Sequence, residues 1–169
     1  MTYSVSLRPL TEADLAMLLQ WRNAPEVRCN MYTQHKISES EHRQWFQRAQ
    51  QNPQRHLLMA EQDGQPFGFG NIQLIDPMAK RGEWGFYLSP KIPKGRGHSL
   101  GIAALNYAFI ELKLHKLCGE ALANNTRSRK FHERLGFKQE SYLRDHHFDG
   151  QAYHDVIGYA LLYSEWQAF

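Results

Sequence analysis

A glycine-rich segment past the middle of the chain limits the folds open to this sequence more than any other feature. Residues 94–101 read Lys-Gly-Arg-Gly-His-Ser-Leu-Gly, and a helical stripe of apolar residues follows through 102–112. A predicted strand, 116–123, leads into the polar run 124–128 and a short helix that closes in Leu-Gly-Phe at 135–137. Free N–H groups at a helix start favour an anion, and glycines let phosphate oxygens approach the chain closely. This order of turn, helix, strand and helix indicates a phosphate-binding turn beside a surface along which a long ligand can lie.

The rest of the chain predicts a mixed sheet. Helices are expected after Thr11, which can cap a turn containing Asp14, and after Ser38, which opens a capping box; Pro25 should end the first helix. Alternation and turn residues predict further strands at 3–8, 56–61, 67–75, 83–88, 138–148 and 153–163. Antiparallel pairs thus flank one strand–helix crossover. We predict an α/β fold with a mixed, mostly antiparallel seven-stranded sheet and about four helices.

Size and composition narrow the class of protein. The 169 residues predict one domain, 1–169. We expect a cytoplasmic protein with no membrane partner, because no run reaches the length of a membrane span and the first residues are not an apolar signal. The scattered basic residues and formal charge of +3 argue against nucleic acid. Cys29 and Cys118 have no metal-like spacing, so we expect reduced thiols and no metal.

The glycine pattern has a competing interpretation. Gly95-x-Gly97-x-x-x-Gly101 could be part of a dinucleotide-binding fingerprint. A doubly wound domain would place that fingerprint after its first strand and follow it with several parallel units, which this chain does not provide. A plain glycine loop is the other alternative, and the whole unit 94–137 argues against it.

Segment 94–137 resembles the acetyl-CoA-binding core of the GNAT superfamily of N-acetyltransferases. The superfamily signature, Arg/Gln-x-x-Gly-x-Gly/Ala, aligns with residues 92–97, with both glycines matched and Ile92 in place of the usual Arg or Gln. A second register starts at Lys94 and uses Gly97 and Ser99. Asn125-x-x-Ser128 and the Leu-Gly-Phe at 135–137 match the later motif of the same superfamily.

The resemblance implies that acetyl-CoA is the co-substrate. The glycine turn would bind its pyrophosphate, and backbone N–H groups at the end of strand 83–88 would polarise the thioester carbonyl. Asn125 would bind the pantetheine amide or cap its helix, and both roles can hold at once. The charged turn residues could equally be solvated. The predicted cofactor-binding residues are Tyr87, Leu88, Lys94, Gly95, Arg96, Gly97, His98, Ser99, Asn125 and Ser128.

Three residues are the predicted catalytic groups. His132 stands where the superfamily commonly has a tyrosine that protonates the departing thiolate, and a histidine pKa of about 6.5 against about 8.5 for a thiol allows that transfer. An exposed helix histidine is the alternative. Glu83 and Glu120 lie on strands that would flank the acetyl group and are candidate bases, and His42, near a helix start, is a third. A solvated or salt-bridged carboxylate, or a water chain in place of the base, is the alternative.

The front half of the chain carries a narrower resemblance. The pairs and triplets 21–23, 27–28, 31–32, 37–38 and 41–42 resemble the pseudaminic-acid pathway acetyltransferases, which acetylate the 4-amino group of a UDP-linked dideoxy sugar. Residues 94–97 and 115–117 also fit that group. The implied substrate-binding residues are Arg22, which could fork onto a diphosphate, and Met31 and His42, which would border the nucleotide or sugar.

Two alternatives stay open. The tail, 146–166, is similar to the branch that includes ribosomal-protein alanine acetyltransferases, so a protein N-terminus is the second candidate acceptor. A non-catalytic acyl-CoA-binding module on the same fold is the third reading. The sequence leaves both a monomer and a homodimer open.

Overall fold

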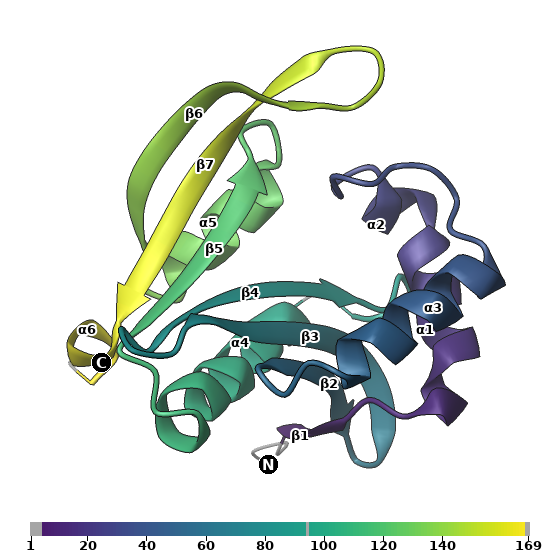
Figure 1. Ribbon diagram of the computed structural model, residues 1–169, viewed down its shortest axis with the longest axis horizontal. Coiled ribbons are helices and arrows are strands. Elements are labelled where there is room, and N and C mark those ends of the chain that lie inside the picture. Colours follow the sequence, from purple (N-terminus) through teal and green to yellow (C-terminus); the bar gives the residue numbers. More distant parts are fainter. Residues whose placement is uncertain (1–4, 94, 168–169) are drawn as a thin grey trace.

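A seven-stranded sheet organises the computed structural model, which describes residues 5–93 and 95–167. The strand order is β1-β2-β3-β4-β5-β7-β6, and every neighbouring pair is antiparallel except β4 and β5 (Figure 1). The predicted mixed, mostly antiparallel seven-stranded sheet is therefore confirmed. The strands are β1 (Val5–Pro9), β2 (Arg55–Gln62), β3 (Gln65–Asp76), β4 (Arg81–Leu88), β5 (Lys116–Leu122), β6 (Lys138–Phe148) and β7 (Tyr153–Leu162).

The described residues form six α-helices, more than the four or so that the sequence predicts. The additional ones, α2 and α6, are single turns of four residues, and Pro25 takes the first position of α2 instead of only ending α1. No described helix is long and apolar enough to cross a membrane. The helices are α1 (Leu15–Asn23), α2 (Pro25–Arg28), α3 (Glu39–Gln50), α4 (Arg96–Asn106), α5 (Thr126–Arg134) and α6 (Tyr163–Trp166), with a 3₁₀ turn at Glu12–Asp14 and a π-helical turn at Tyr107–Glu111.

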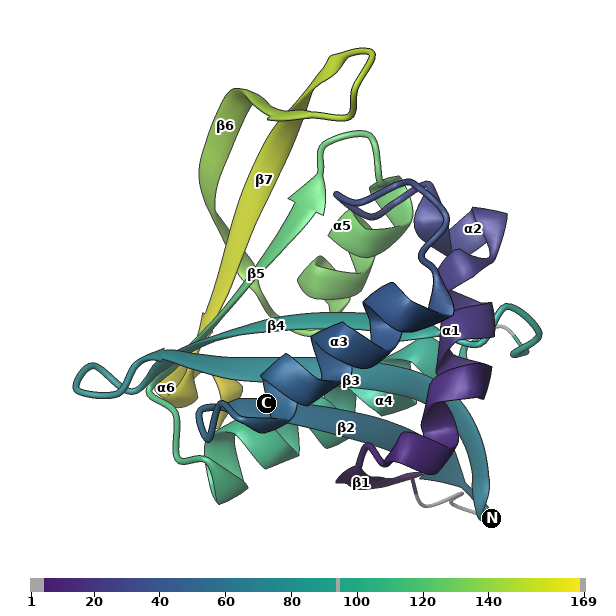
Figure 2. The same ribbon diagram turned by 45° about the vertical axis from the view of Figure 1, so that its right-hand side comes forward.

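The two faces of the sheet carry different helices. On one face, α1 and α3 bury Leu18, Trp21 and Phe46 against side chains of β2 and β3. On the other face, α4 packs over β1 and β3 and α5 over β5, and their side chains form the larger core with those of β4 and β7 (Figure 2). Successive strand residues point to opposite faces, so neighbouring residues of β4 serve different cores.

The start of α1 is fixed by a partly buried ion pair. Arg8 of β1 donates from Nη1 and Nη2 to the two oxygens of Asp14 at 2.7 and 2.8 Å, and from Nε to Glu61 of β2 at 2.6 Å. The hydrogen bond from Arg8 lowers the pKa of Asp14 to about 2. This pairing joins α1 to the edge of the sheet and so helps to position the residues at its far end.

The sheet splits between its two parallel strands. β4 and β5 pair only at Arg81–Lys116, Gly82–Leu117 and Glu83–Cys118, while β4 continues beside β3 and β5 continues beside β7. Beyond the last pair the strands diverge (Figures 1 and 2). Within the described part of the chain, backbone groups on the facing edges of 84–88 and 119–122 therefore lack a strand partner. The split leaves an opening in the middle of the sheet.

Candidate active site

Two helices begin at the mouth of the opening. Because α4 follows β4 and α5 follows β5, both helix starts lie at the carboxyl ends of the parallel strands. Gly95 caps α4 with φ +97°, a conformation that glycine adopts without strain. The first N–H groups of a helix have no partner within it, so this end of α4 presents donors to an anion.

The turn predicted to bind pyrophosphate is partly helical. α4 begins at Arg96, so Gly97, His98 and Ser99 lie in its first turn instead of in a loop before it. A Cβ atom on Gly97 would lie 3.3 Å from Leu88 and 3.8 Å from Phe131 of α5. The structure thus brings this turn together with the end of β4 and with α5. Lys94 lies outside the described residues.

The start of α5 has the capping interaction that the sequence predicts. The side-chain oxygen of Asn125 accepts a hydrogen bond from the N–H of Ser128 at 3.1 Å. This bond uses the carbonyl side of the amide, whereas a pantetheine contact would use either end. The cap is confirmed, and the pantetheine contact stays a prediction. Tyr87 and Leu88 lie on the stretch of β4 that borders the opening.

His132 is a core residue. Its side chain is 1% exposed, and its Nε2 lies 3.1 Å from the indole nitrogen of Trp84. An indole N–H can only donate, so Nε2 must be the unprotonated acceptor, and Nδ1 must carry the proton that is donated to the carbonyl of Ser128 at 2.9 Å. Burial lowers the pKa of His132 and favours this neutral form. Neither nitrogen has a proton directed at the opening, so the geometry favours a packing role over the acid role expected from the sequence.

The two candidate bases lie together on the opposite face from Trp84. Glu83 and Glu120 are exposed, and the negative charge of each contributes to the raised pKa of Tyr32. Tyr32 Oη donates to Glu120 Oε2 at 2.5 Å, and burial, reinforced by this bond, raises the pKa of Tyr32. The phenol therefore keeps its proton. The loop between α2 and α3 thus reaches over to β5 and covers one side of the carboxylate pair.

A histidine on the β6–β7 hairpin completes this side of the site. The ring of His147 lies 4.6 Å from that of Tyr32, and its Nε2 is buried without a hydrogen-bond partner among the described residues. Behind it, His154 bonds to Asp149 at 2.6 Å. From the sequence, Tyr32 is considered only together with Met31, as a residue that could pack on a uracil or sugar face, and His147 is interpreted mainly as structural. The only sequence signal for Tyr32 is its place beside Met31 in the front-half motif.

A half-buried cation lies at the other end of the same face. Arg22, near the end of α1, donates from Nη2 to the carbonyl of Thr33 at 2.9 Å, while its Nη1 is buried and has no partner within the described ranges. Burial lowers the pKa of Arg22, and Tyr87, Glu41 and Arg28 are close enough to act on its charge. The guanidinium thus has an unused donor.

The other two predicted substrate residues lie near Arg22. His42 is 5% exposed and stacks on Trp45 at 5.1 Å; burial, and then the charge of Arg22, lowers its pKa. Met31 is half-buried in the loop that carries Tyr32. The structure therefore groups Arg22 with His42 and places Met31 on the neighbouring loop.

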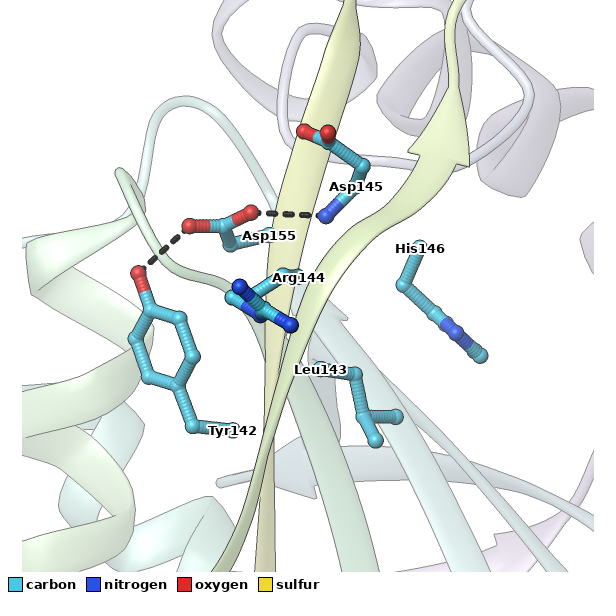
Figure 3. Close-up of a pocket in the computed structure, with 6 residues that line it drawn as sticks. All are labelled: Tyr142, Leu143, Arg144, Asp145, His146 and Asp155. Atoms are coloured by element: carbon cyan, nitrogen blue, oxygen red, sulfur yellow. Dashed lines mark hydrogen bonds between the residues drawn. The ribbon is translucent and has the colours of Figure 1, made fainter.

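A separate hollow lies on the β6–β7 hairpin (Figure 3). Its central carboxylate, Asp155, accepts from the hydroxyl of Tyr142 at 2.5 Å and from the N–H of Asp145 at 2.8 Å. None of its lining residues belongs to β4, α4 or α5, so it is distinct from the opening. The hollow is lined by Tyr142, Leu143, Arg144, Asp145, His146 and Asp155.

Comparison with known proteins agrees with this geometry. Residues 4–138 match the model of the acetyltransferase (GNAT) domain. YdaF of Bacillus subtilis, provisionally named a ribosomal N-acetyltransferase, is 30% identical over 62% of this chain and 58% of its own length. The acetyltransferase PseH of Campylobacter jejuni is 27% identical over 76% of this chain and 79% of its own. The spermidine N-acetyltransferase of Vibrio cholerae, solved with CoA and spermine, shares the fold with a TM-score of 0.89 at 22% identity, covering 96% of this chain and 98% of that one.

Proposed function

The chain belongs to the acetyltransferase (GNAT) family, and we propose that its acceptor is the 4-amino group of a UDP-linked 4-amino-4,6-dideoxy sugar of the pseudaminic acid pathway. The protein is an acetyl-CoA-dependent N-acetyltransferase, and the proposal concerns which molecule accepts the acetyl group. The donor belongs at the opening between β4 and β5, where α4 presents its N–H groups. The acceptor then belongs on the face that carries Glu83, Glu120 and Arg22.

The observation that carries the proposal is the unpartnered Nη1 of Arg22. A buried guanidinium donor without a partner favours an anionic ligand, because leaving it unpaired costs about 1–3 kcal/mol or more. The carboxylates of Glu83 and Glu120 at the other end of the face favour an amine. A nucleotide sugar with a free amino group carries both charges, with its diphosphate for Arg22 and its amine for the carboxylates.

In the proposed reaction, the carboxylates accept a proton from the amine and the backbone of β4 stabilises the oxyanion. The neutral amine attacks the thioester carbon, and its proton passes to Glu120 or Glu83, directly or through water. Backbone N–H groups on the free edge of β4 stabilise the oxyanion. The carbon–sulfur bond then breaks, and CoA leaves as its thiolate. His42 and Met31 support the nucleotide end, and Asn125, Ser128 and the turn from Gly95 to Ser99 hold the donor.

Two other acceptors are suggested by the relatives. A protein N-terminus is favoured by the likeness to YdaF, and a polyamine by the spermidine acetyltransferases. Both are cationic and suit Glu83 and Glu120. Neither brings an anion for Arg22, so the buried Nη1 of this half-buried side chain favours the nucleotide sugar over them.

Kinetics with Arg22→Ala test the acceptor. Loss of a charged hydrogen bond of this kind costs about 1.5–3 kcal/mol, so KM for the UDP-amino-sugar should rise tenfold or more while acetyl-CoA affinity stays nearly unchanged. The matched control is Arg48→Ala, which removes an exposed cation from the last turn of α3. UDP alone should compete with the acceptor. The proposal fails if UDP neither binds nor inhibits while an alanine-ended peptide or spermidine is acetylated efficiently.

A further inference from the structure

The narrow end of the opening is closed by an indole. Glu83 and Cys118 form the last β4–β5 pair, so Trp84 and Gly119 are the first residues of the diverging stretch. A Cβ atom on Gly119 would lie 2.5 Å from Nε1 of Trp84 and 2.6 Å from Nε2 of His132. The side chains of Trp84 and His132 therefore lie directly over Gly119, reaching across from β4 and α5 to β5. There is no room for even a methyl group beneath them.

Both rings are held rigidly. Trp84 is 8% exposed and stacks on Phe137 at 5.2 Å with an interplanar angle of 9°. His132 stacks on Tyr159 at 4.9 Å and 7°. The indole N–H donates to His132, whose own N–H is anchored on the Ser128 carbonyl of α5. Moving the indole would break this chain and disturb close packing, which interiors resist.

The direction of the opening places the thioester next to this pair. The phosphate end of the donor belongs at the start of α4, which lies beside Leu88 at the wide end of β4. An arm that runs from there along the free edges of β4 and β5 first passes Phe86, whose ring lies 4.4 Å from that of Phe131 and 5.0 Å from that of Trp84, and then points toward Trp84 and Gly119. The acyl group is at the tip of that arm. What lies at the narrow end therefore limits the size of the acyl group.

We propose that Trp84 is the end wall of the acyl slot and restricts the donor to short acyl groups such as acetyl, with His132 as the positioning residue that fixes the indole. This inference concerns the donor and goes beyond the proposed acceptor. It assigns His132 a function through Trp84 and not through proton transfer. In a hydrophobic pocket, one additional methylene on the ligand typically changes its affinity by about 10- to 200-fold.

Binding of four donors to the unmodified protein is the first test, and it needs no acceptor. Titration calorimetry would compare CoA, acetyl-CoA, propionyl-CoA and butyryl-CoA. CoA and acetyl-CoA should bind within a few-fold of each other, and butyryl-CoA at least about tenfold more weakly than acetyl-CoA. Equal affinities for acetyl-CoA and butyryl-CoA would overturn the proposal. The result is independent of whether a nucleotide sugar is the acceptor.

Variants of Trp84 and His132 distinguish the residue that limits the acyl group from the residue that positions it. Trp84→Phe should raise butyryl-CoA affinity about tenfold relative to acetyl-CoA while leaving CoA affinity unchanged. His132→Leu, which cannot accept from the indole, should relax selectivity in the same direction, whereas His132→Gln keeps an acceptor and should retain most of it. Trp166→Phe, in an aromatic stack with Phe109 away from the opening, is the control. Unchanged selectivity in a folded Trp84→Phe protein excludes the wall, and equal behaviour of His132→Leu and His132→Gln excludes positioning by the hydrogen bond.

Discussion

Among single residues, His132 shows how burial changes the use of a titratable group. The indole of Trp84 needs an unprotonated Nε2, and burial lowers the pKa of the ring. In the unfolded chain the same ring binds a proton below about pH 6.5. Because the unfolded state then binds protons that the folded state excludes, folding stability is full above pH 6.5 and falls as the pH drops below it. His42 and His56, whose pKa values burial also lowers, act in the same direction.

Denaturant unfolding at pH 7.5, 6.5 and 5.5 checks this linkage. The free energy of unfolding should fall with acid by up to about 1.4 kcal/mol per pH unit for each such histidine. His132→Gln removes one titrating ring while keeping an acceptor for Trp84, so its slope should be smaller. Identical slopes for the two proteins would contradict a buried, neutral His132.

The same residue marks the limit of inference from sequence. Asn125 was predicted as a cap and is one, because its partner Ser128 is three residues away. The partner of His132 is Trp84, 48 residues earlier, and that of Tyr32 is Glu120, 88 residues later. A motif places His132 on the correct helix and suggests a proton donor. Only the tertiary fold shows that both of its nitrogens are engaged.

At the scale of elements, the start of α4 is the part of the site that the sequence predicts best. Glycine spacing and the apolar stripe locate the helix to within a residue or two, and in the structure Gly95 caps α4, which begins at Arg96. The split between β4 and β5 was not predictable in this way. Alternation in 83–88 shows which side chains share a face, but not where the ladder to β5 ends.

Substitution of Gly97 tests the role of this helix start. A Cβ atom there would already lie 3.3 Å from Leu88, and the branched side chain of Gly97→Val would also crowd the approach of a phosphate. We expect acetyl-CoA affinity to fall at least about tenfold, a loss of roughly 1.4 kcal/mol, by calorimetry on folded protein. Gly70→Ala, whose added Cβ meets no atom within 4 Å, is the control and should bind normally. Unchanged affinity in Gly97→Val would exclude this turn as the pyrophosphate site.

The whole molecule consists of two half-sheets that meet along a short seam. Three ladder pairs join β4 to β5, and among the described residues side-chain hydrogen bonds cross between the halves from Trp84 to His132 on one face and from Tyr32 to Glu120 on the other. The proposed donor and acceptor sites both lie along this seam. A donor that occupies the opening would replace the missing ladder with its own contacts to both strands, so its binding should stabilise the halves together.

Hydrogen exchange and thermal unfolding can test this bridging. At 100 times its Kd, acetyl-CoA should stabilise the protein by about 2.7 kcal/mol, or roughly 5–10 °C in Tm for a chain of this size. Amide exchange should slow at the start of α4 and also along 84–88 and 119–122, the edges that lack a strand partner. Adenosine 3′,5′-bisphosphate, which has no pantetheine arm, is the matched control and should not slow exchange in 119–122. If acetyl-CoA slows exchange only in α4, the arm does not lie between β4 and β5, and the acyl wall at Trp84 loses its premise.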